Sequence, residues 1–352
     1  MHMADALLSP TTGAAFWATS SVAMAWCARR LRTDSREHLV PLMGVLGAFV
    51  FAAQMINFTI PGTGSSGHIG GGMLLSILLG GPAAFVVIAS VLTVQALIFA
   101  DGGLLALGAN VFNLGVIPCF IAYPLIFKPL LRASGTAPTR SRFGLMTVLA
   151  TVVGLQLGAL GVVIETRMSG ISSLPLGTFL LLMQPIHLAI GIVEGLATAA
   201  VVGFLREARP DLVEVGALAT DRPNAAFPTR IVALIAVSAL LTGGVFSWFA
   251  SAAPDGLEWS IEQVTGKSEV DADDAIHQAL ARWQTRIAPM PDYQFAPAAS
   301  TPGATEASET EPAWPAIDAG TSTAGVLGGA ATLLIVVAIG YLLRPPGARI
   351  AR

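Results

Sequence analysis

The sequence predicts an all-α membrane protein that crosses the bilayer several times. Two observations predict this fold class: the low content of charged residues and the long apolar runs. Of the 352 residues, 54% are hydrophobic and only 12% are charged, about half of the roughly 25% found in soluble domains. The mean hydropathy is +0.70, and several apolar runs approach the roughly 20 residues that a helix needs to cross a bilayer. These features exclude a disordered chain, a disulfide-stapled secreted module and most water-soluble enzymes.

The apolar runs give nine predicted membrane spans. They lie at residues 12–28, 40–57, 68–81, 83–100, 104–127, 144–165, 176–205, 230–249 and 322–343. The third run is too short to span without tilting, and the glycines at its start predict irregular backbone that lines a cavity. Cys27 and Cys119 lie inside apolar runs, so they are expected to act as small hydrophobes and not as a disulfide framework or metal site.

The basic residues give the chain a direction in the membrane. Fifteen of the 19 Lys and Arg residues fall in the loops at 29–36, 128–142, 206–230 and 344–352, on one side of the predicted topology. Short loops rich in Lys and Arg stay in the cytoplasm, so the N-terminus is predicted outside and the C-terminus inside. Residues 1–10 contain no Lys or Arg, which indicates a retained N-terminus and not a signal peptide. The net charge of −3 provides no basic field for nucleic acid.

Composition also predicts a division into modules. Residues 1–206 form a seven-helix membrane domain, 207–229 a polar cytoplasmic linker, 230–343 a two-helix module and 344–352 a cytoplasmic tail. Within the two-helix module, residues 250–321 form a large outer loop with 12 of the 22 acidic residues. Its second half, rich in Ala, Pro, Ser and Thr, has a composition that rarely repays the entropy of folding. The acidic loop either attracts cations or is simply a solvated surface, and the sequence fits both.

The histidines are the scarce groups that could bind a metal. His38 and His277 lie in polar segments and are predicted to be solvated, whereas His2 and His68 both fall on the predicted outer side. An α-amine titrates at about 7.7–8.0 and an imidazole at about 6.5, so both supply neutral nitrogens near neutral pH. If His2 folds back, the Met1 amine, the His2 main-chain nitrogen and the His2 imidazole form fused chelate rings, and His68 adds a fourth nitrogen. Four coplanar nitrogens suit Ni(II) or Cu(II).

The sequence leaves simpler explanations of these histidines open. His2 is otherwise an ordinary N-terminal residue, and His68 a histidine at a helix start that is bonded to its glycine-rich loop. That loop, Gly62–Gly67, also fits the G-x-x-x-x-G pattern of a phosphate-binding loop, but His68 and Ile69 stand where Lys and Ser or Thr are required. The chain is therefore not expected to hydrolyse ATP by itself.

Five segments carry recognisable motifs: Met1–Pro10, Asn57–Gly81, Gly108–Gly115, His187–Leu196 and Pro254–Glu258. The first four resemble the CbiM/NikM family, the substrate-capture (S) components of energy-coupling-factor (ECF) transporters for cobalt and nickel. The start is similar to the family's Met-His-Ile-Pro-Asp-Gly-x-Leu-Ser-Pro, with Met3 and Ala4 in place of Ile-Pro and Ala6 in place of Gly. The fifth is similar to the Pro-Asp-Gly-Leu-Glu (PDGLE) signature of the NikN-like subunit or fused domain of the same systems.

The resemblance implies a transporter subunit that catalyses no covalent reaction. Met1, His2 and His68 would hold Ni(II) or Co(II), which is carried as substrate with no organic cofactor. The implied partners are a transmembrane coupling (T) component and separate ATP-binding cassette ATPases, with membrane lipid around them in the prokaryotic inner membrane. The planar set of nitrogens and the fused PDGLE module favour nickel over cobalt.

Polar residues within the spans are candidates for supporting roles. Asn57, Asn110 and Asn113 are expected to orient the ligands or, alternatively, to form interhelical hydrogen bonds. His187 and Glu194 project from one face of a helix, and ionisable groups inside a span are functional candidates by default. They either pair as a structural link or connect the metal site to coupling motions.

A stripe of small residues suggests a close helix contact. Gly44, Ala48 and Ala52 recur at every fourth position, which allows close backbone approach between membrane helices. Internal packing is the commoner explanation, and the resemblance makes the same residues candidates for docking the T component.

Two other functions would use some of the same side chains. An intramembrane zinc hydrolase would need His68, His187 and Glu194 as ligands, but the chain has no His-Glu-x-x-His pair. A proton-coupled secondary transporter would work through His187 and Glu194 and would not depend on ATPases. The motifs favour the ECF capture subunit over both.

Overall fold

The computed structural model describes residues 2–34, 36, 39–135, 138–172, 174–209, 213, 229–268, 270, 274–295 and 314–343. These parts of the chain are mainly helical, with one two-stranded sheet. Five of their helical stretches are long and apolar enough to cross a membrane: Gly81–Ile98, Leu107–Ala133, Arg140–Ser169, Leu176–Ala208 and Ala319–Leu343. The prediction of an all-α polytopic membrane protein is confirmed.

Each predicted span contains a helix within the described residues. The elements are α1 (Pro10–Leu31), α2 (Leu39–Gln54), α3 (Gly72–Leu79), α4 (Gly81–Ile98), α5 (Leu107–Val111), a π-helical segment (Phe112–Phe127), α6 (Lys128–Ala133), α7 (Arg140–Ser169), α8 (Leu176–Ala208), α10 (Thr229–Gly244) and α13 (Ala319–Leu343). α5, the π-helical segment and α6 follow one another directly and form one of the long stretches. The module boundary at 207–229 stays a prediction, because most of that linker and the tail at 344–352 lie outside the described residues.

The third predicted span is a short helix, as its length suggests. α3 has only eight residues, far fewer than the roughly 20 needed to cross a bilayer. The residue before it, Gly71, has a φ of 77°, and every residue of α3 is buried. In the irregular backbone before α3, Gly70 and Gly71 are also buried, and burial within protein is the condition under which such backbone is tolerated at membrane depth.

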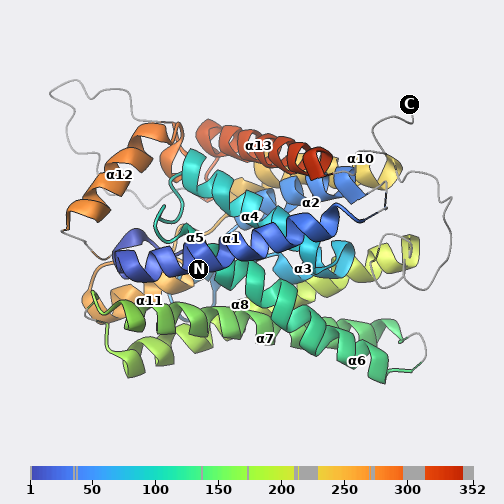
Figure 1. The fold of residues 1–352 in the computed structure, drawn as a ribbon, viewed down its shortest axis with the longest axis horizontal. Coiled ribbons are helices and arrows are strands. Elements are labelled where there is room, and N and C mark those ends of the chain that lie inside the picture. Colours follow the sequence, from blue (N-terminus) through green and yellow to red (C-terminus); the bar gives the residue numbers. More distant parts are fainter. Residues whose placement is uncertain are drawn as a thin grey trace.

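α2 is covered by the two helices of the C-terminal module. It packs along α13 and α10, and the three lie side by side in the upper part of Figure 1. Gly44, Ala48 and Ala52 are all buried. A Cβ atom on Gly44 would come within 2.6 Å of Val337 on α13, so the two helices approach closely at this stripe. Internal packing therefore explains the stripe, and α13 occupies the face considered for the T component.

A glycine-rich hairpin joins α2 to α3. β1 (Phe58–Ile60) pairs antiparallel with β2 (Ser65–Gly67). The turn between them contains Gly62 and Gly64 with φ values of 76° and 77°, which glycine adopts without strain. The segment that mimics a phosphate-binding loop is therefore a hairpin.

The PDGLE signature docks on this hairpin. Ser66 N donates to Pro254 O at 2.8 Å, and Ser66 Oγ donates to Ala253 O at 2.7 Å. Gly256 then begins α11 (Gly256–Thr265), which packs against α8 so closely that a Cβ on Gly256 would lie 2.6 Å from Ile186. These contacts place the start of α11 between the hairpin and α8.

The predicted outer loop contains a second helix, α12 (Ala275–Ile287), that packs on the membrane domain. Gln284 Nε2 donates to Ala96 O at 3.0 Å and to Gly102 O at 2.7 Å, beside the end of α4. α11 and α12 both lie toward the left end of the bundle in Figure 1. Residues 296–313, which include most of the low-complexity part of the loop, lie outside the described residues.

One prediction in this loop is wrong: His277 is not solvated. Its side chain is 3% exposed, Nε2 bonds to Leu8 O at 2.9 Å, and Nδ1 bonds to Asp274. Burial lowers the pKa of His277, but the acceptors at Leu8 and Asp274 outweigh burial and raise it. The error arises because α12 folds back onto the N-terminal segment, a contact that the local polar sequence does not reveal. His38, the other histidine in a polar segment, lies outside the described residues.

Candidate metal centre

The N-terminal segment is fixed in the membrane domain through its main chain. Met3 is fully buried. Its N–H donates to Asn110 Oδ1 at 2.8 Å, and its carbonyl accepts from Asn110 Nδ2 at 3.2 Å and Gly103 N at 2.9 Å. His2 is therefore attached to a rigid anchor. Met1, the predicted amine donor, lies outside the described residues.

His2 and His68 meet although they are distant in sequence. Their rings are stacked, with centroids 5.1 Å apart and an interplanar angle of 7°. The stack makes the two imidazoles close neighbours. The lone pair of a ring nitrogen lies in the plane of its ring, so the two parallel rings would have to turn relative to one another for both to bind one ion at the usual distance of about 2.0–2.1 Å. His68 Nδ1 lies 3.1 Å from Ile69 O, which leaves Nε2 as the lone-pair nitrogen of the neutral ring.

Asp101 lies beside the two histidines and is not among the residues predicted from the sequence. Its Oδ1 lies 3.2 Å from His2 Nδ1, and its Oδ2 accepts a hydrogen bond from the Tyr293 hydroxyl. Burial opposes ionisation, but the interaction with His2 and the hydrogen bonds from His2 and Tyr293 lower the pKa of Asp101 to about 2. A carboxylate thus adjoins the imidazole pair. The sequence does single out Asp101 in one way, because it is the only Asp or Glu between residues 38 and 164.

The backbone around this carboxylate is held in an uncommon conformation. Ala100 and Tyr293 have φ values of 56° and 60°, in the left-handed region that non-glycine residues rarely adopt. Such residues cost on the order of 1–3 kcal/mol and persist where the surrounding structure enforces them, often at functional sites. Because Tyr293 comes from the predicted outer loop, the C-terminal module contributes directly to the candidate centre.

Glu194 fixes the loop that begins with His68. Its Oε2 and Oε1 accept from Gly70 N at 2.8 Å and Gly71 N at 2.9 Å. Gln54 Nε2 donates to Gly70 O at 2.8 Å on the other side of the same loop. The carboxylate of Glu194 therefore holds the main chain two and three residues after His68. It can affect the His68 imidazole only through the position of that main chain.

His187 does not pair with Glu194, so that alternative from the sequence is wrong. His187 Nδ1 bonds to Met183 O at 2.7 Å, one turn earlier in α8. The two side chains share a helix face but are two turns apart, and each finds a nearer main-chain partner. His187 instead lies against a cavity that also touches His68.

The three predicted asparagines have different partners. Asn110 holds the N-terminal segment, as described above. Asn113 Nδ2 donates to Glu165 Oε2 at 2.8 Å, which is an interhelical bond within the bundle. The carbonyl of Asn57 accepts from Ser251 N at 2.7 Å and ties the end of α2 to the C-terminal module. Of the three, Asn110 is the one whose side chain bonds to the main chain next to a predicted ligand.

The side chains of the cluster are of types that bind metal ions. The cluster offers two imidazoles and a carboxylate, and imidazole suits late first-row divalent ions. Within the described ranges, no three His, Cys, Asp or Glu side chains group closely enough to hold an ion. Further donors would have to come from main-chain nitrogen or from Met1.

We expect Asn110→Ala to weaken metal binding by about 10- to 100-fold, the usual cost of removing a group that orients a ligand. The substitution deletes both side-chain bonds to Met3, so the main chain next to His2 is held less firmly before the metal arrives. Equilibrium titration with Ni(II) and Co(II) measures the effect. Asn113→Ala is the matched control, because its amide bonds to Glu165 and should leave the affinity unchanged. Equal affinities for the two variants would contradict a positioning role for Asn110.

The fold and this site together define a polytopic, all-α membrane protein with an imidazole and carboxylate cluster. Residues 2–212 match the family described as the cobalt uptake substrate-specific transmembrane region, CbiM, and residues 229–345 match the PDGLE domain. Because the first match covers more than half of the chain, the protein belongs to the CbiM family, with a PDGLE domain following.

Individual relatives agree with this assignment. The fused nickel transport protein NikMN of Rhodobacter capsulatus is 31% identical over 281 residues, 76% of this chain and 78% of that protein. The cobalt transport protein CbiM of Geobacter sulfurreducens is 31% identical over 253 residues, 68% of this chain and 70% of that protein. A crystal structure of a transition metal transporter matches with a TM-score of 0.54 and 29% identity, and covers 64% of this chain and 100% of that chain.

Proposed function

We propose that this protein is the substrate-capture subunit of an ATP-driven ECF transporter that takes up Ni(II) or Co(II). The observation that carries the proposal is the stacking of His2 on His68 beside Asp101. Imidazoles are suitable ligands for both ions. The family match is named for cobalt uptake, and the Rhodobacter relative is named for nickel transport.

In this proposal the amino terminus supplies the remaining donors. The Met1 amine, the His2 main-chain nitrogen and His2 Nδ1 close two fused chelate rings, and His68 Nε2 is the fourth nitrogen. Nδ1 is the ring nitrogen of His2 near enough to its own main chain to close such a ring. It faces Asp101 in the structure, so the metal takes the place of that contact. A planar set of four nitrogens favours Ni(II) over Co(II).

The proposal also covers the source of energy for transport and the orientation of the protein in the membrane. The sequence that mimics a phosphate-binding loop is a hairpin, which supports ATP hydrolysis by separate ATPases that act through a T component. The distribution of basic residues supports an extracytoplasmic N-terminus in the prokaryotic inner membrane. Since α13 covers the α2 stripe, we assign the T component to another surface.

Extending the chain before Met1 is expected to abolish high-affinity metal binding. The extension converts the amine into an amide nitrogen, which could bind only after losing its N–H proton, so the chelate loses its one neutral amine donor. Titration of purified protein with Ni(II) and Co(II), with Met1 as the first residue or with residues added before it, measures the effect. The same peptide added after Arg352 is the control and should not change binding. Unchanged affinity in the N-terminally extended protein would exclude the amine as a ligand.

A second arm of this experiment tests the energy source. In vesicles that contain the protein with its coupling and ATPase partners, metal uptake should stop when the ATPases are omitted. Uptake that continues without them would favour a proton-coupled carrier.

A further inference from the structure

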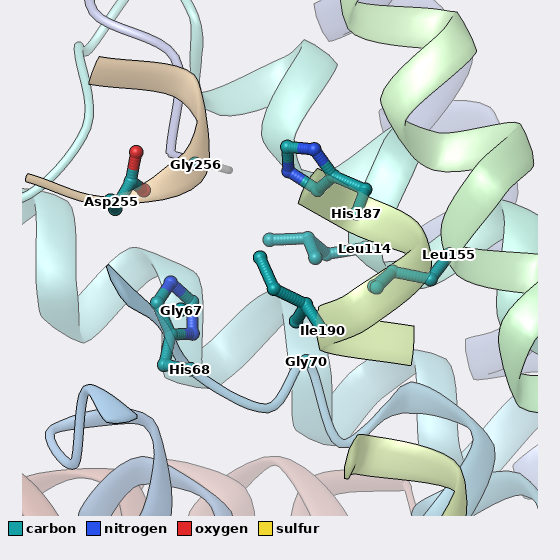
Figure 2. Close-up of a pocket in the computed structure, with 9 residues that line it drawn as sticks. All are labelled: Gly67, His68, Gly70, Leu114, Leu155, His187, Ile190, Asp255 and Gly256. Atoms are coloured by element: carbon teal, nitrogen blue, oxygen red, sulfur yellow. The ribbon is translucent and has the colours of Figure 1, made fainter. Parts of the chain in front are cut away.

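A small cavity extends from His68 toward α8. Its polar side chains are His68, His187 and Asp255, and its other walls are mainly apolar. The cavity has a volume of about 10 Å³, enough for about one water molecule or one ion. Figure 2 shows that the three polar side chains come from three separate elements: the loop before α3, α8 and the start of α11.

His187 presents an unpaired nitrogen in this region. The side chain is fully buried, and Nδ1 is engaged with Met183 O at 2.7 Å. In the neutral ring, Nδ1 is then the donor and Nε2 carries the lone pair. Nε2 has no hydrogen-bond partner among the described residues. Buried polar atoms without a partner are uncommon and call for an explanation.

His68 has the arrangement of a metal ligand on its side of the same cavity. Its Nδ1 is 3.1 Å from Ile69 O, as that of His187 is held by Met183. Metal-binding histidines typically donate their second ring N–H to a carbonyl or carboxylate, which fixes the ring and leaves the other nitrogen for the ion. Two imidazoles oriented in this way line one cavity.

The third polar wall of the cavity is a fixed carboxylate. Asp255 Oδ1 accepts from Leu257 N at 2.7 Å and Glu258 N at 2.9 Å, so it caps α11 and stays at the cavity wall. A negative charge there reduces the cost of bringing a divalent cation into a buried space. Asp255 belongs to the PDGLE signature, so the second module supplies the charge.

Close packing brings these elements together. A Cβ on Gly67 would lie 2.4 Å from Ile190, and a Cβ on Gly256 would lie 3.2 Å from His187 Cε1. A larger residue at either position would push the hairpin or α11 away from α8. The two glycines therefore allow His68, His187 and Asp255 to share one cavity.

We propose that His68 and His187, with the charge of Asp255, form an inner transfer site for the metal ion. This inference rests on the proposed capture function: the ion passes from the N-terminal chelate to the second imidazole while His68 remains bound to it. No set of three His, Cys, Asp or Glu side chains is preformed within the described residues, and this suits a transfer site. An ion passes through such a site only if binding there is strong enough for it to enter and weak enough for it to leave.

The first test observes the imidazoles directly. In protein extended before Met1, where the chelate is blocked, Co(II) is added and the ring Hε1 signals of isotope-labelled histidines are followed by NMR. The paramagnetic ion should broaden the signals of His68 and His187. The signal of His277 should stay sharp, since both of its ring nitrogens are engaged by Leu8 and Asp274. Broadening of His68 without any change at His187 would overturn the inner site.

The second test separates transfer from capture. His187→Gln should keep Ni(II) binding within about twofold and lower ATP-driven uptake at least about tenfold, the smallest effect typical of groups that support a metal. His277→Gln, the control, should transport normally. Normal uptake by His187→Gln would overturn the proposal. Absence of metal binding by the unaltered protein would instead overturn the capture function, and if His187→Gln fails to fold, the NMR result on native His187 decides.

Discussion

Replacing His68 with alanine is expected to abolish high-affinity binding of Ni(II) and Co(II), and His2→Ala should do the same. The two rings stack at 5.1 Å, and in the proposed site each of them supplies one nitrogen to the ion, so each substitution removes a proposed ligand. Loss of a direct ligand should exceed the roughly 10- to 100-fold cost of losing a group that merely orients one. Equilibrium titration of the purified proteins measures the loss.

His277→Gln is the matched control for these two variants. His277 is also buried near the N-terminal segment, but its nitrogens bond to Leu8 O and Asp274. Glutamine can keep a bond to the Leu8 carbonyl, so metal affinity should stay close to that of the unaltered protein. Stoichiometric, high-affinity binding by His68→Ala would remove His68 from the site, whatever the behaviour of the control.

Glu194→Gln is expected to lower both metal affinity and thermal stability. Two main-chain N–H groups, on Gly70 and Gly71, point at the carboxylate. The glutamine amide can accept from one of them but presents its own N–H to the other. A buried donor left without an acceptor costs about 1–3 kcal/mol, and the loop that begins with His68 loses its support. Metal titration and thermal unfolding, measured on the same samples, check both effects.

A second buried glutamate provides the comparison for Glu194. Glu165 accepts a bond from Asn113 at 2.8 Å within the bundle, and Glu165→Gln keeps an oxygen that can accept it. We therefore expect Glu165→Gln to leave metal affinity unchanged. If Glu194→Gln lowers stability but binds metal as well as Glu165→Gln does, then Glu194 supports the fold without positioning the ligand.

The membrane fold was predictable because its strongest determinant is local. A lipid core requires apolar runs of a certain length, and each predicted span contains a helix in the described part of the chain. Even the short third span was visible, since its glycines interrupt the apolar pattern. The small-residue stripe on α2 was visible too, but its partner was not. Close approach is encoded in Gly44, whereas the choice of α13 as the neighbour depends on packing between helices far apart in sequence.

The candidate site divides in the same way. The sequence by itself determined the membrane fold class and which residues could donate nitrogen, including His2 and His68, because ligand chemistry belongs to residue type. Only the tertiary structure decided that these two rings meet, that Asp101 adjoins them, and that His277 is buried and bonds to the Leu8 carbonyl. It also brought Asp255 of the PDGLE signature to the cavity shared by His68 and His187. The physical reason is that distances between remote side chains are fixed by helix packing and main-chain hydrogen bonds, which no local pattern specifies.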